Sequence, residues 1–405
     1  LNRLALLYRE TCKFSAAESL YLQADLIAKK FTGGNDTVYA TNLNNLASLY
    51  QHLGRYDKAE QLFTLVSSLL KNLVGESHPT YLSSLNNLAS LFTEMGFYER
   101  ARNIQIQVLE KRRQILGEKH PDFAQSLNNL AYLQVMLGQY RDAETNYVKA
   151  TEIYRNTLGE NHPAYASSIS NLAELYTNIG DYDKAEQLYM QAMEIRKKTV
   201  GMNHTDYSSS LNDLATCYET MGLYDKAEKL FLESKERTAR ALGEQHPFYI
   251  TTLNNLAALY FDRGSYEQAE PLYQQALELR KKTLSEQHPS YALSLNNLGT
   301  LYFAIGQFEK AALFFRKALD IRKAVYGEKH FDYANSLNDL AAVYEKQKQF
   351  DQAEKLYLQA MGIRRMVYGE NHNDYATSMN NLASLYVNTG QYRRAEELVL
   401  AANAI

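Results

Sequence analysis

Histidine is the side chain in this sequence whose type and number could build a reactive or metal-binding site. Imidazole serves both as a general base and as a common metal ligand. Eight of the nine histidines, however, lie at a constant interval of 42 residues: His78, His120, His162, His204, His246, His288, His330 and His372. Side chains that converge on one metal ion have no reason to keep a constant interval, whereas side chains that occur once per structural unit do. The interval therefore indicates a repeat array in which each histidine caps or packs its own unit.

No other set of side chains is a candidate for catalysis or metal binding. Glu76, Glu118 and Glu160 stand two residues before their histidines, but a constellation repeated along an array is not a plausible active site. The ninth histidine, His52, has no Cys, His or Asp partner in view. There is no glycine-rich phosphate loop, and the 19 glycines mark turns. We therefore expect no catalytic residue, no metal, no cofactor and no small-molecule substrate.

The composition excludes several classes of partner. The net charge is −3 and no long run of one sign occurs, which does not fit a nucleic-acid-binding surface. No apolar stretch approaches the roughly 20 residues of a membrane span, and no signal peptide opens the chain. Cys12 and Cys217 are too few for a disulfide framework, and Cys217 takes a position where other repeats have leucine, which predicts burial. We expect a cytoplasmic protein.

The array covers the whole sequence. The Asn44-Asn45-Leu46 motif recurs in each unit with few changes, and a first copy lies at Asn2-Arg3-Leu4. This predicts one solenoid over residues 1–405, with a partial first repeat at 1–39 and repeats that begin near residues 40, 82, 124, 166, 208, 250, 292, 334 and 376. Neither Leu1 nor Ile405 lies beside the polar cap of a solenoid terminus, so we expect the sequence to be part of a longer protein.

Each repeat is predicted to be a helical hairpin. In the second repeat, apolar side chains recur with the spacing of one helix face in two segments: Leu43, Leu46, Ala47 and Tyr50, then Tyr56, Ala59, Leu62, Phe63 and Val66. Gly54 separates the two segments, and a longer turn at residues 75–79 follows the second. We call the first helix of each repeat helix A and the second helix B.

Turn residues and charges follow the ends of these helices. Glycines after helix B predict left-handed C-caps: Gly75, Gly117, Gly159, Gly243, Gly327 and Gly369. Prolines are expected in the first turn of helix A (Pro79, Pro121, Pro163, Pro247 and Pro289) and at the start of helix B (Pro271). Acids early in helix B (Glu60, Glu186, Glu228, Glu270 and Glu354) and bases at its end (Arg196 to Lys198, Arg280 to Lys282, Arg364 and Arg365) complement the helix dipole.

The motif Leu-x2-Leu-Ala-x2-Tyr-x3-Gly-x-Tyr-x2-Ala-x3-Phe, which begins at Leu43, resembles the tetratricopeptide repeat. The 42-residue form, most complete from Tyr291 to Gly327, resembles the repeats of kinesin light chain and their bacterial relatives. The resemblance implies an all-α, right-handed superhelical solenoid of about ten helix-turn-helix repeats, with helix A on the concave side, where extended peptides bind. The heptad segment that would join a kinesin light chain to its motor is absent from this sequence.

A polar stripe beside the core face of helix A is the candidate binding surface. In the second repeat this inner stripe comprises Asn44, Ser48 and Gln51, with Thr41 and His52 at its edges. Its asparagines are the candidate peptide-binding residues: Asn44, Asn86, Asn128, Asn212, Asn254, Asn296, Asn338 and Asn380. An amide both donates and accepts, so a ladder of amides would hold an extended peptide by its backbone, as the resemblance implies. Alternatively, these asparagines bridge adjacent A helices, and Ser170 interrupts the ladder.

Positions where the stripe varies are expected to select side chains of the partner. Phe261 and Phe303 replace polar residues in repeats 7 and 8, and Tyr132, Val135 and Met136 form an apolar patch in repeat 4. Apolar residues in an otherwise polar groove predict pockets for apolar anchors. The alternative is local repacking of helix A.

The charges on the stripe are mostly acidic: Glu10, Glu94, Glu174, Glu219, Asp262 and Glu345, against Arg9 and Lys346. This departs from the basic groove of kinesin light chains and from the lysine-containing clamp of chaperone-binding repeats. We therefore expect a non-enzymatic scaffold that binds a neutral to basic peptide or protein segment with apolar anchors. The alternative is a sensory or regulatory arm of a larger signalling enzyme, such as a caspase-like protease or a STAND-type ATPase, whose catalytic part lies outside this sequence.

Overall fold

The computed structural model describes residues 1–11 and 13–405. Cys12 and the side chain of Glu10, both named above, lie outside this description. The described residues form twenty α-helices and no strand. The helices are α1 (Asn2–Glu10), α2 (Phe14–Thr32), α3 (Thr37–His52), α4 (Tyr56–Val74), α5 (Pro79–Glu94), α6 (Tyr98–Leu116), α7 (Pro121–Met136), α8 (Tyr140–Leu158), α9 (Pro163–Asn178), α10 (Tyr182–Thr199), α11 (Thr205–Thr220), α12 (Tyr224–Leu242), α13 (Pro247–Asp262), α14 (Tyr266–Thr283), α15 (Pro289–Ala304), α16 (Phe308–Tyr326), α17 (Phe331–Lys346), α18 (Phe350–Tyr368), α19 (Asn373–Asn388) and α20 (Tyr392–Asn403).

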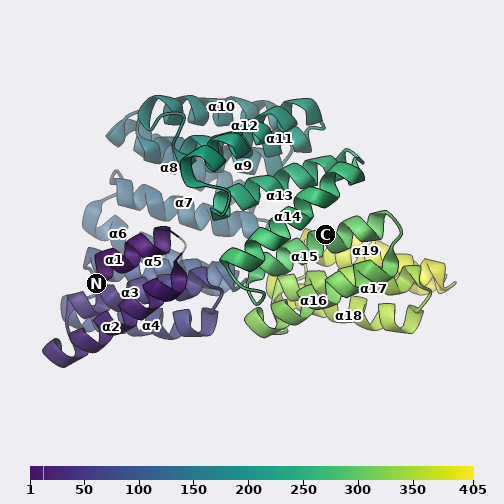
Figure 1. Ribbon diagram of the computed structural model, residues 1–405, viewed down its shortest axis with the longest axis horizontal. Coiled ribbons are helices and arrows are strands. Elements are labelled where there is room, and N and C mark those ends of the chain that lie inside the picture. The colour runs from purple at the N-terminus through teal and green to yellow at the C-terminus, as the bar shows by residue number, and fades with distance from the viewer. Residues whose placement is uncertain (12) are drawn as a thin grey trace. The chain divides into compact units, whose positions relative to one another are not determined.

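From α1 to α6 and from α9 to α20, helix A and helix B of a repeat pack against each other, and helix B then packs against the next helix A. Pairs such as α3 with α4, α15 with α16 and α17 with α18 are the A–B hairpins, while α4 with α5 and α16 with α17 join successive repeats (Figure 1). The predicted all-α array of helix-turn-helix repeats is confirmed. Among the described residues, no helix is both long and apolar enough to cross a membrane.

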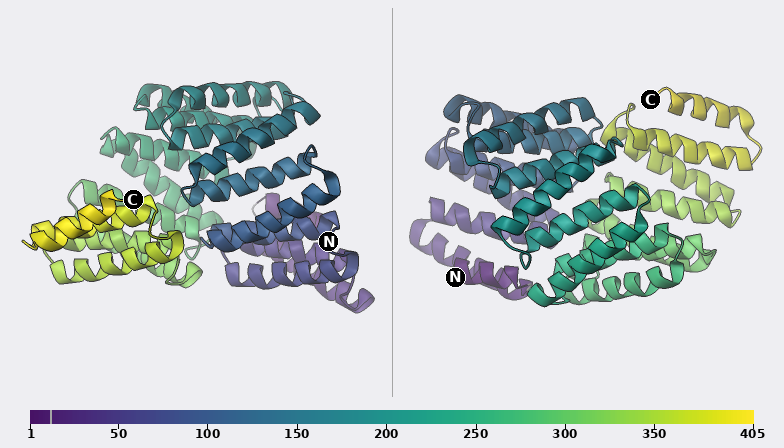
Figure 2. Two further views of the ribbon diagram at one scale, coloured as in Figure 1. Left: turned by 180° about the vertical axis from the view of Figure 1, so that it is seen from behind. Right: turned by 90° about the horizontal axis from the view of Figure 1, so that it is seen from above.

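The chain divides into two compact units. Unit 1 comprises residues 1–134 and 141–160, and unit 2 comprises residues 135–140 and 161–405. In unit 1, one apolar cluster runs without a break through α3, α4, α5 and α6, with Leu43, Val66, Leu82 and Val108 among its buried members. In unit 2 the same helix positions build equivalent clusters, around Leu253 in repeat 7 and around Leu295 and Leu337 in the next two repeats. The stacked pairs can be followed in two further views (Figure 2).

The repeated histidines are helix caps. At each one, the backbone N–H two residues later donates to Nδ1 over 3.0 to 3.3 Å, from His78 to His372. Because Nδ1 accepts this hydrogen bond, a neutral ring carries its proton on Nε2. The cap satisfies one of the orphan N–H groups of helix A, and the prolines follow it in the first helical turn as predicted. The period-42 histidines therefore belong to the scaffold.

Two turn predictions need correction. The glycines after helix B do have positive φ. At Gly75, Gly117, Gly243, Gly327 and Gly369, however, ψ is 163° to 177°. This is not the left-handed helical region but an extended one that essentially only glycine adopts. Pro271 is the sixth residue of α14, beyond the first turn in which it was expected. Its missing N–H removes a bond that the backbone carbonyl of Glu267 would otherwise accept.

Candidate functional site

Most asparagines of the inner stripe are buried or half-buried in the array. Asn212 and Asn254 are buried, with 5% and 8% of their surface exposed. Asn44, Asn86, Asn128, Asn296 and Asn338 are half-buried, and only Asn380 of the eight is exposed. Ser170, which interrupts the ladder, is also buried. These side chains therefore contact other residues of the array. A ligand that binds them must either fit beside those residues or displace them.

Three of the predicted asparagines accept a hydrogen bond from the next repeat. The second asparagine of the next repeat donates from Nδ2 to Oδ1 of the first: Asn87 to Asn44, Asn297 to Asn254 and Asn381 to Asn338, each over 2.8 Å. Bridging of adjacent A helices, the alternative left open above, thus occurs at these steps. Within the described residues, the Nδ2 groups of Asn44, Asn254 and Asn338 donate to no protein group.

The ladder is different at the remaining steps. Asn296 accepts from Nη1 of Arg322 over 3.0 Å and donates to the carboxylate of Asp339, so both of its ends are used. Asn212 donates to Oγ1 of Thr252 over 2.8 Å. Oδ1 of Asn212 and of Asn86 is buried and accepts no hydrogen bond from the described part of the chain. The eight positions are therefore not equivalent.

The predicted apolar anchors pack mainly within their own repeats. The ring of Phe261 lies 5.5 Å from that of Tyr266, and the ring of Phe303 lies 5.6 Å from that of Phe308. Each contact joins the end of helix A to the first residue of its own helix B. Tyr132 is 42% exposed on α7, and Val135 is half-buried. The local repacking considered above is thus part of the environment of both phenylalanines, which still keep a partly exposed face.

A row of buried arginines was missed by sequence reasoning. Five arginines at the end of helix B are at most 9% exposed: Arg112, Arg196, Arg280, Arg322 and Arg364. Each donates from Nη1 to the serine hydroxyl fourteen residues later, over 2.6 to 2.9 Å. The interpretation of Arg196, Arg280 and Arg364 as helix-end charges is therefore incomplete, because these guanidinium groups clamp the next helix A. The signal that could have found them is an Arg–Ser pair at spacing 14 that recurs with the period.

The acids early in helix B have a second role that was also missed. A tyrosine near the end of the next helix A donates its hydroxyl to them: Tyr218 to Glu186, Tyr260 to Glu228, Tyr302 to Glu270 and Tyr386 to Glu354, over 2.6 to 2.7 Å. Since the partners are 32 residues apart, they join successive repeats. The scaffold is thus held at both ends of the hairpin, by Arg–Ser pairs at one and Tyr–Glu pairs at the other.

The stripe carboxylates fall into two groups. Glu94 accepts from Gln51 over 2.6 Å, and Glu345 accepts from Asn388 over 2.6 Å and from Tyr357 over 3.1 Å. Glu219 of α11 and Asp262 of α13, in contrast, have no hydrogen-bond or cationic partner among the described residues.

Burial shifts the pKa values of these unpaired carboxylates. It raises the pKa of Glu219 to about 7, with a smaller contribution from the negative charge of Asp262. Burial also raises the pKa values of Asp262 and of Glu174 on α9. Among the residues that the structure describes, no cation offsets the charge of these three groups. Unit 2 therefore carries uncompensated negative charge on its A helices.

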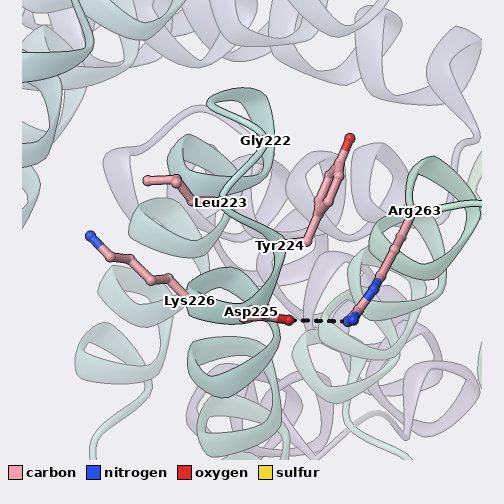
Figure 3. A pocket seen from close by; sticks show the side chains of 6 residues that line it. All are labelled: Gly222, Leu223, Tyr224, Asp225, Lys226 and Arg263. Atoms are coloured by element: carbon pink, nitrogen blue, oxygen red, sulfur yellow. Dashed lines mark ion pairs between the residues drawn. The ribbon is translucent and has the colours of Figure 1, made fainter.

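One surface pocket lies apart from the stripe. It is lined by Gly222, Leu223, Tyr224, Asp225, Lys226 and Arg263 at the turn between α11 and α12 (Figure 3). Arg263 pairs there with Asp225 over 3.3 Å and with Glu228 over 3.2 Å, so its charge is already neutralised. The pocket includes none of the predicted site residues. Within residues 1–11 and 13–405, no three His, Cys, Asp or Glu side chains are grouped as a metal site would require.

Comparison with known sequences matches one family model to nearly the whole chain. The tetratricopeptide repeat model matches residues 1–72, 80–156, 122–198, 206–282, 250–324, 314–365 and 332–402. No curated protein was found to match.

Solved structures give related matches. BtubC (BKLC) from P. vanneervenii is 27% identical, with a TM-score of 0.47 over 58% of this chain and 94% of that one. The kinesin light chain TPR-like repeats of Podosopora anserina are 26% identical, with a TM-score of 0.41 over 49% and 95% of the two chains. A Rap protein complexed with competence and sporulation factor is 14% identical, with a TM-score of 0.59 over 90% and 97%, which is a likeness of fold alone.

Proposed function

Because this chain belongs to the tetratricopeptide repeat family, we propose that it is a non-enzymatic scaffold that holds an extended segment of a protein partner along the inner stripe. The observation that carries the proposal is the uncompensated carboxylate charge of Glu219 and Asp262 on neighbouring A helices. The carboxylate of Glu219 is half-buried, and leaving it without a donor costs free energy unless a partner supplies one; Asp262 is exposed and adds a second negative charge nearby. The spare amide donors of Asn254 and Asn338 supply the complementary contacts.

The spacing of the repeats suits an extended peptide. Packed helices lie about 8–10 Å apart, and three residues of an extended chain span about 10 Å. Consecutive A helices of unit 2, such as α11 and α13, are in contact. One stripe amide would therefore meet every third peptide unit, with Asn380 and the free Nδ2 groups of Asn254 and Asn338 donating to backbone carbonyls.

The chemistry of the partner segment follows from the stripe. Carboxylates without cations favour a segment that is neutral or basic overall. Phe261 and Phe303, both in unit 2, would contact its apolar side chains. Tyr132 and Val135 of α7 are a separate candidate contact for apolar side chains. Since the pKa of Glu219 is raised to about 7, its charge is present above that pH and lost below it. Binding of a basic segment should therefore weaken as the pH falls through about 7.

The test is a peptide array of acidic, neutral and basic extended sequences, probed with the wild-type chain and with a Glu219→Gln, Asp262→Asn double variant. We expect the wild type to select neutral and basic sequences with apolar residues, and the double variant to lose the basic preference. Glu278→Gln is the matched control, because it removes one charge from the exposed outer face of α14. Strong selection of acidic sequences by the wild type would overturn the proposed chemistry.

A further inference from the structure

One cap histidine of unit 2 contacts a turn that belongs to an earlier repeat. His372, the N-cap of α19 in repeat 10, lies beside Gly138, in the turn between α7 and α8 of repeat 4. A Cβ atom at Gly138 would stand 3.5 Å from Cδ2 and 3.9 Å from Nε2 of the His372 ring. The contact lies within unit 2, because residues 135–140 group with residues 161–405.

The approach of another repeat is specific to this turn. At the equivalent glycines of unit 2, a Cβ atom would meet nothing within 4 Å: Gly180, Gly222, Gly264, Gly306 and Gly390. Like Gly138, each of these glycines has a positive φ, so the turns themselves are alike. The neighbour of Gly138 is therefore a feature of the tertiary structure and not of the repeat.

Three neighbours hold the imidazole of His372 in place. Nδ1 accepts from the backbone N–H of Asp374 over 3.1 Å, and the ring stacks on Tyr368 with 4.3 Å between the ring centroids. A neutral ring therefore carries its proton on Nε2. Burial lowers the pKa of His372, while Asp374 and a hydrogen bond with the backbone of Met136 raise it. Because only an acceptor favours the protonated ring, the partner is the carbonyl oxygen of Met136.

The two sides of the contact are chemically complementary. Met136 is the last residue of α7, and the final carbonyl groups of a helix have no donor within that helix. The Nε2–H group of His372 supplies one. Because Gly138 has no side chain, the ring can lie against the turn. One imidazole forms a single hydrogen bond here and buries little surface, so the contact is weak enough to open and close.

The same turn carries part of the apolar patch that we expect to bind a partner. Val135 and Met136 are half-buried at the end of α7. We propose that His372 and residues 135–140 form a clasp within unit 2, which must open before a partner segment can use Val135 and Met136. The clasp is thus an autoinhibitory contact. The contact itself needs no partner, whereas its inhibitory role rests on the proposed function.

The chain offers a matched pair of variants in the turns. Gly138→Lys places a long side chain against the ring of His372. The turn accepts a lysine, since Lys348 occupies the equivalent position of repeat 9 with a positive φ. Gly222→Lys is the control, because it introduces the same residue with the same backbone strain at a turn where nothing lies within 4 Å.

The first experiment tests the clasp without a partner. Modification of histidine rings by diethyl pyrocarbonate is followed by peptide mapping in the wild type and in both lysine variants. The side chain of His372 is 12% exposed and that of His204 is 50% exposed. In the wild type, His372 should react about tenfold more slowly than His204, because the open form of a clasp is populated about 10% of the time or less. A His372 ring as reactive as that of His204 would overturn the clasp.

The lysine variants separate the clasp from shielding by Tyr368 alone. Gly138→Lys should raise the rate at His372 severalfold, and Gly222→Lys should leave it unchanged. Because a lysine can turn away from the ring, a crosslink provides a second measurement. A short bifunctional maleimide should join the pair Gly138→Cys and His372→Cys, but not the pair Gly222→Cys and His372→Cys. The clasp is wrong if neither lysine alters the rate and the first pair is not joined.

The second experiment tests the inhibitory role. The peptide array of the proposed function is probed with His372→Asn and with His204→Asn as its control. A cap remains in both variants, since Asp36 caps α3 with a short side chain at the equivalent position. His372→Asn should bind sequences with apolar residues up to about tenfold more tightly than the wild type, because the closed form is lost. His204→Asn should bind as the wild type does.

The outcomes of this array distinguish the clasp from the proposed function. Equal binding by the wild type and His372→Asn would reduce the contact to a structural brace and contradict its inhibitory role. If none of the proteins binds a peptide, while the reactivity of His372 supports the clasp, the proposed function is wrong and the contact remains.

Discussion

At the scale of single residues, Lys348 shows how strongly the hairpin turn is specified. It is the single non-glycine residue with positive φ among those described, at 60°, and it stands where the other complete repeats have glycine between helix A and helix B. Its N–H still donates to the backbone oxygen of Glu345 over 3.0 Å. Lys348 therefore adopts the same turn conformation as the glycines of the other repeats. The left-handed conformation costs a residue with Cβ about 1–2 kcal/mol.

Lys348→Gly should stabilise the chain by about 0.5–1 kcal/mol. Relief of the left-handed strain exceeds the extra entropy that glycine gains in the unfolded chain, about 0.5–1 kcal/mol. The free energy of unfolding in urea measures the change. The matched control is Gln347→Gly, at φ −81°, where glycine offers no conformational advantage and should cost about 0.5–1 kcal/mol. Destabilisation by both variants would mean that Lys348 is not strained.

At the scale of the helix, α14 contains an internal proline, which the equivalent helices lack. Pro271 stands in its second turn and leaves the carbonyl of Glu267 without its helical donor, whereas the equivalent positions of α4 and α10 carry Gln61 and Gln187. The helix nevertheless runs from Tyr266 to Thr283, because Ala269, Tyr273 and Ala276 bury its inner face. Tertiary packing therefore outweighs the local penalty.

Pro271→Gln should stabilise the protein by about 1–3 kcal/mol, because it restores one helical hydrogen bond and removes a steric conflict with the preceding turn. Thermal unfolding followed by circular dichroism would record a higher melting temperature. Pro289→Ala is the comparison, since Pro289 is in the first turn of α15 and has no helical bond to restore. It should instead lose about 0.4–1 kcal/mol, because the unfolded chain becomes more flexible. A neutral or destabilising Pro271→Gln would show that α14 is adapted to its proline.

The helices could be predicted from the sequence because their signals lie on one segment of chain. The spacing of Leu43, Leu46 and Tyr50 gives the inner face of helix A, and a histidine followed by proline marks its start. The contacts between repeats are harder to predict, since each depends on two residues in different helices and is visible in the sequence only as a pair that recurs with the period. Neither Arg322 nor Ser336 is unusual alone, and only their hydrogen bond explains why an arginine is buried. The bond of Asn254 to Asn297 is an instance of the bridging between A helices that was one of two alternatives for the stripe asparagines, and the sequence alone did not decide between them.

At the scale of the whole molecule, a repeat array has no single hydrophobic core to which all of its helices contribute. In unit 2 the apolar clusters of repeats 7, 8 and 9 are built mainly from neighbouring helices. The free energy of unfolding is then close to the sum of the stability of each repeat and of each interface between neighbouring repeats. A substitution that weakens one interface should therefore destabilise only the repeats beside it. The junction of repeats 8 and 9 is suited to a test, because Arg322 there bonds to Asn296, to the backbone oxygen of Asp332 and to Ser336.

Arg322→Met should open this junction and leave distant repeats of unit 2 intact. The substitution removes three hydrogen bonds of a buried guanidinium and one of the two positive charges that act on the half-buried Asp339. Leaving a buried acceptor without its donor costs about 1–3 kcal/mol. Native-state hydrogen exchange should show faster exchange in α16, α17 and α18, with α9 to α12 unchanged. Lys323→Met is the control: it removes only an exposed pair with Glu328 and should leave the exchange rates of all these helices unchanged. If protection instead fell equally from α9 to α20, unit 2 would unfold as one block, and the nearest-neighbour description would be wrong for this chain.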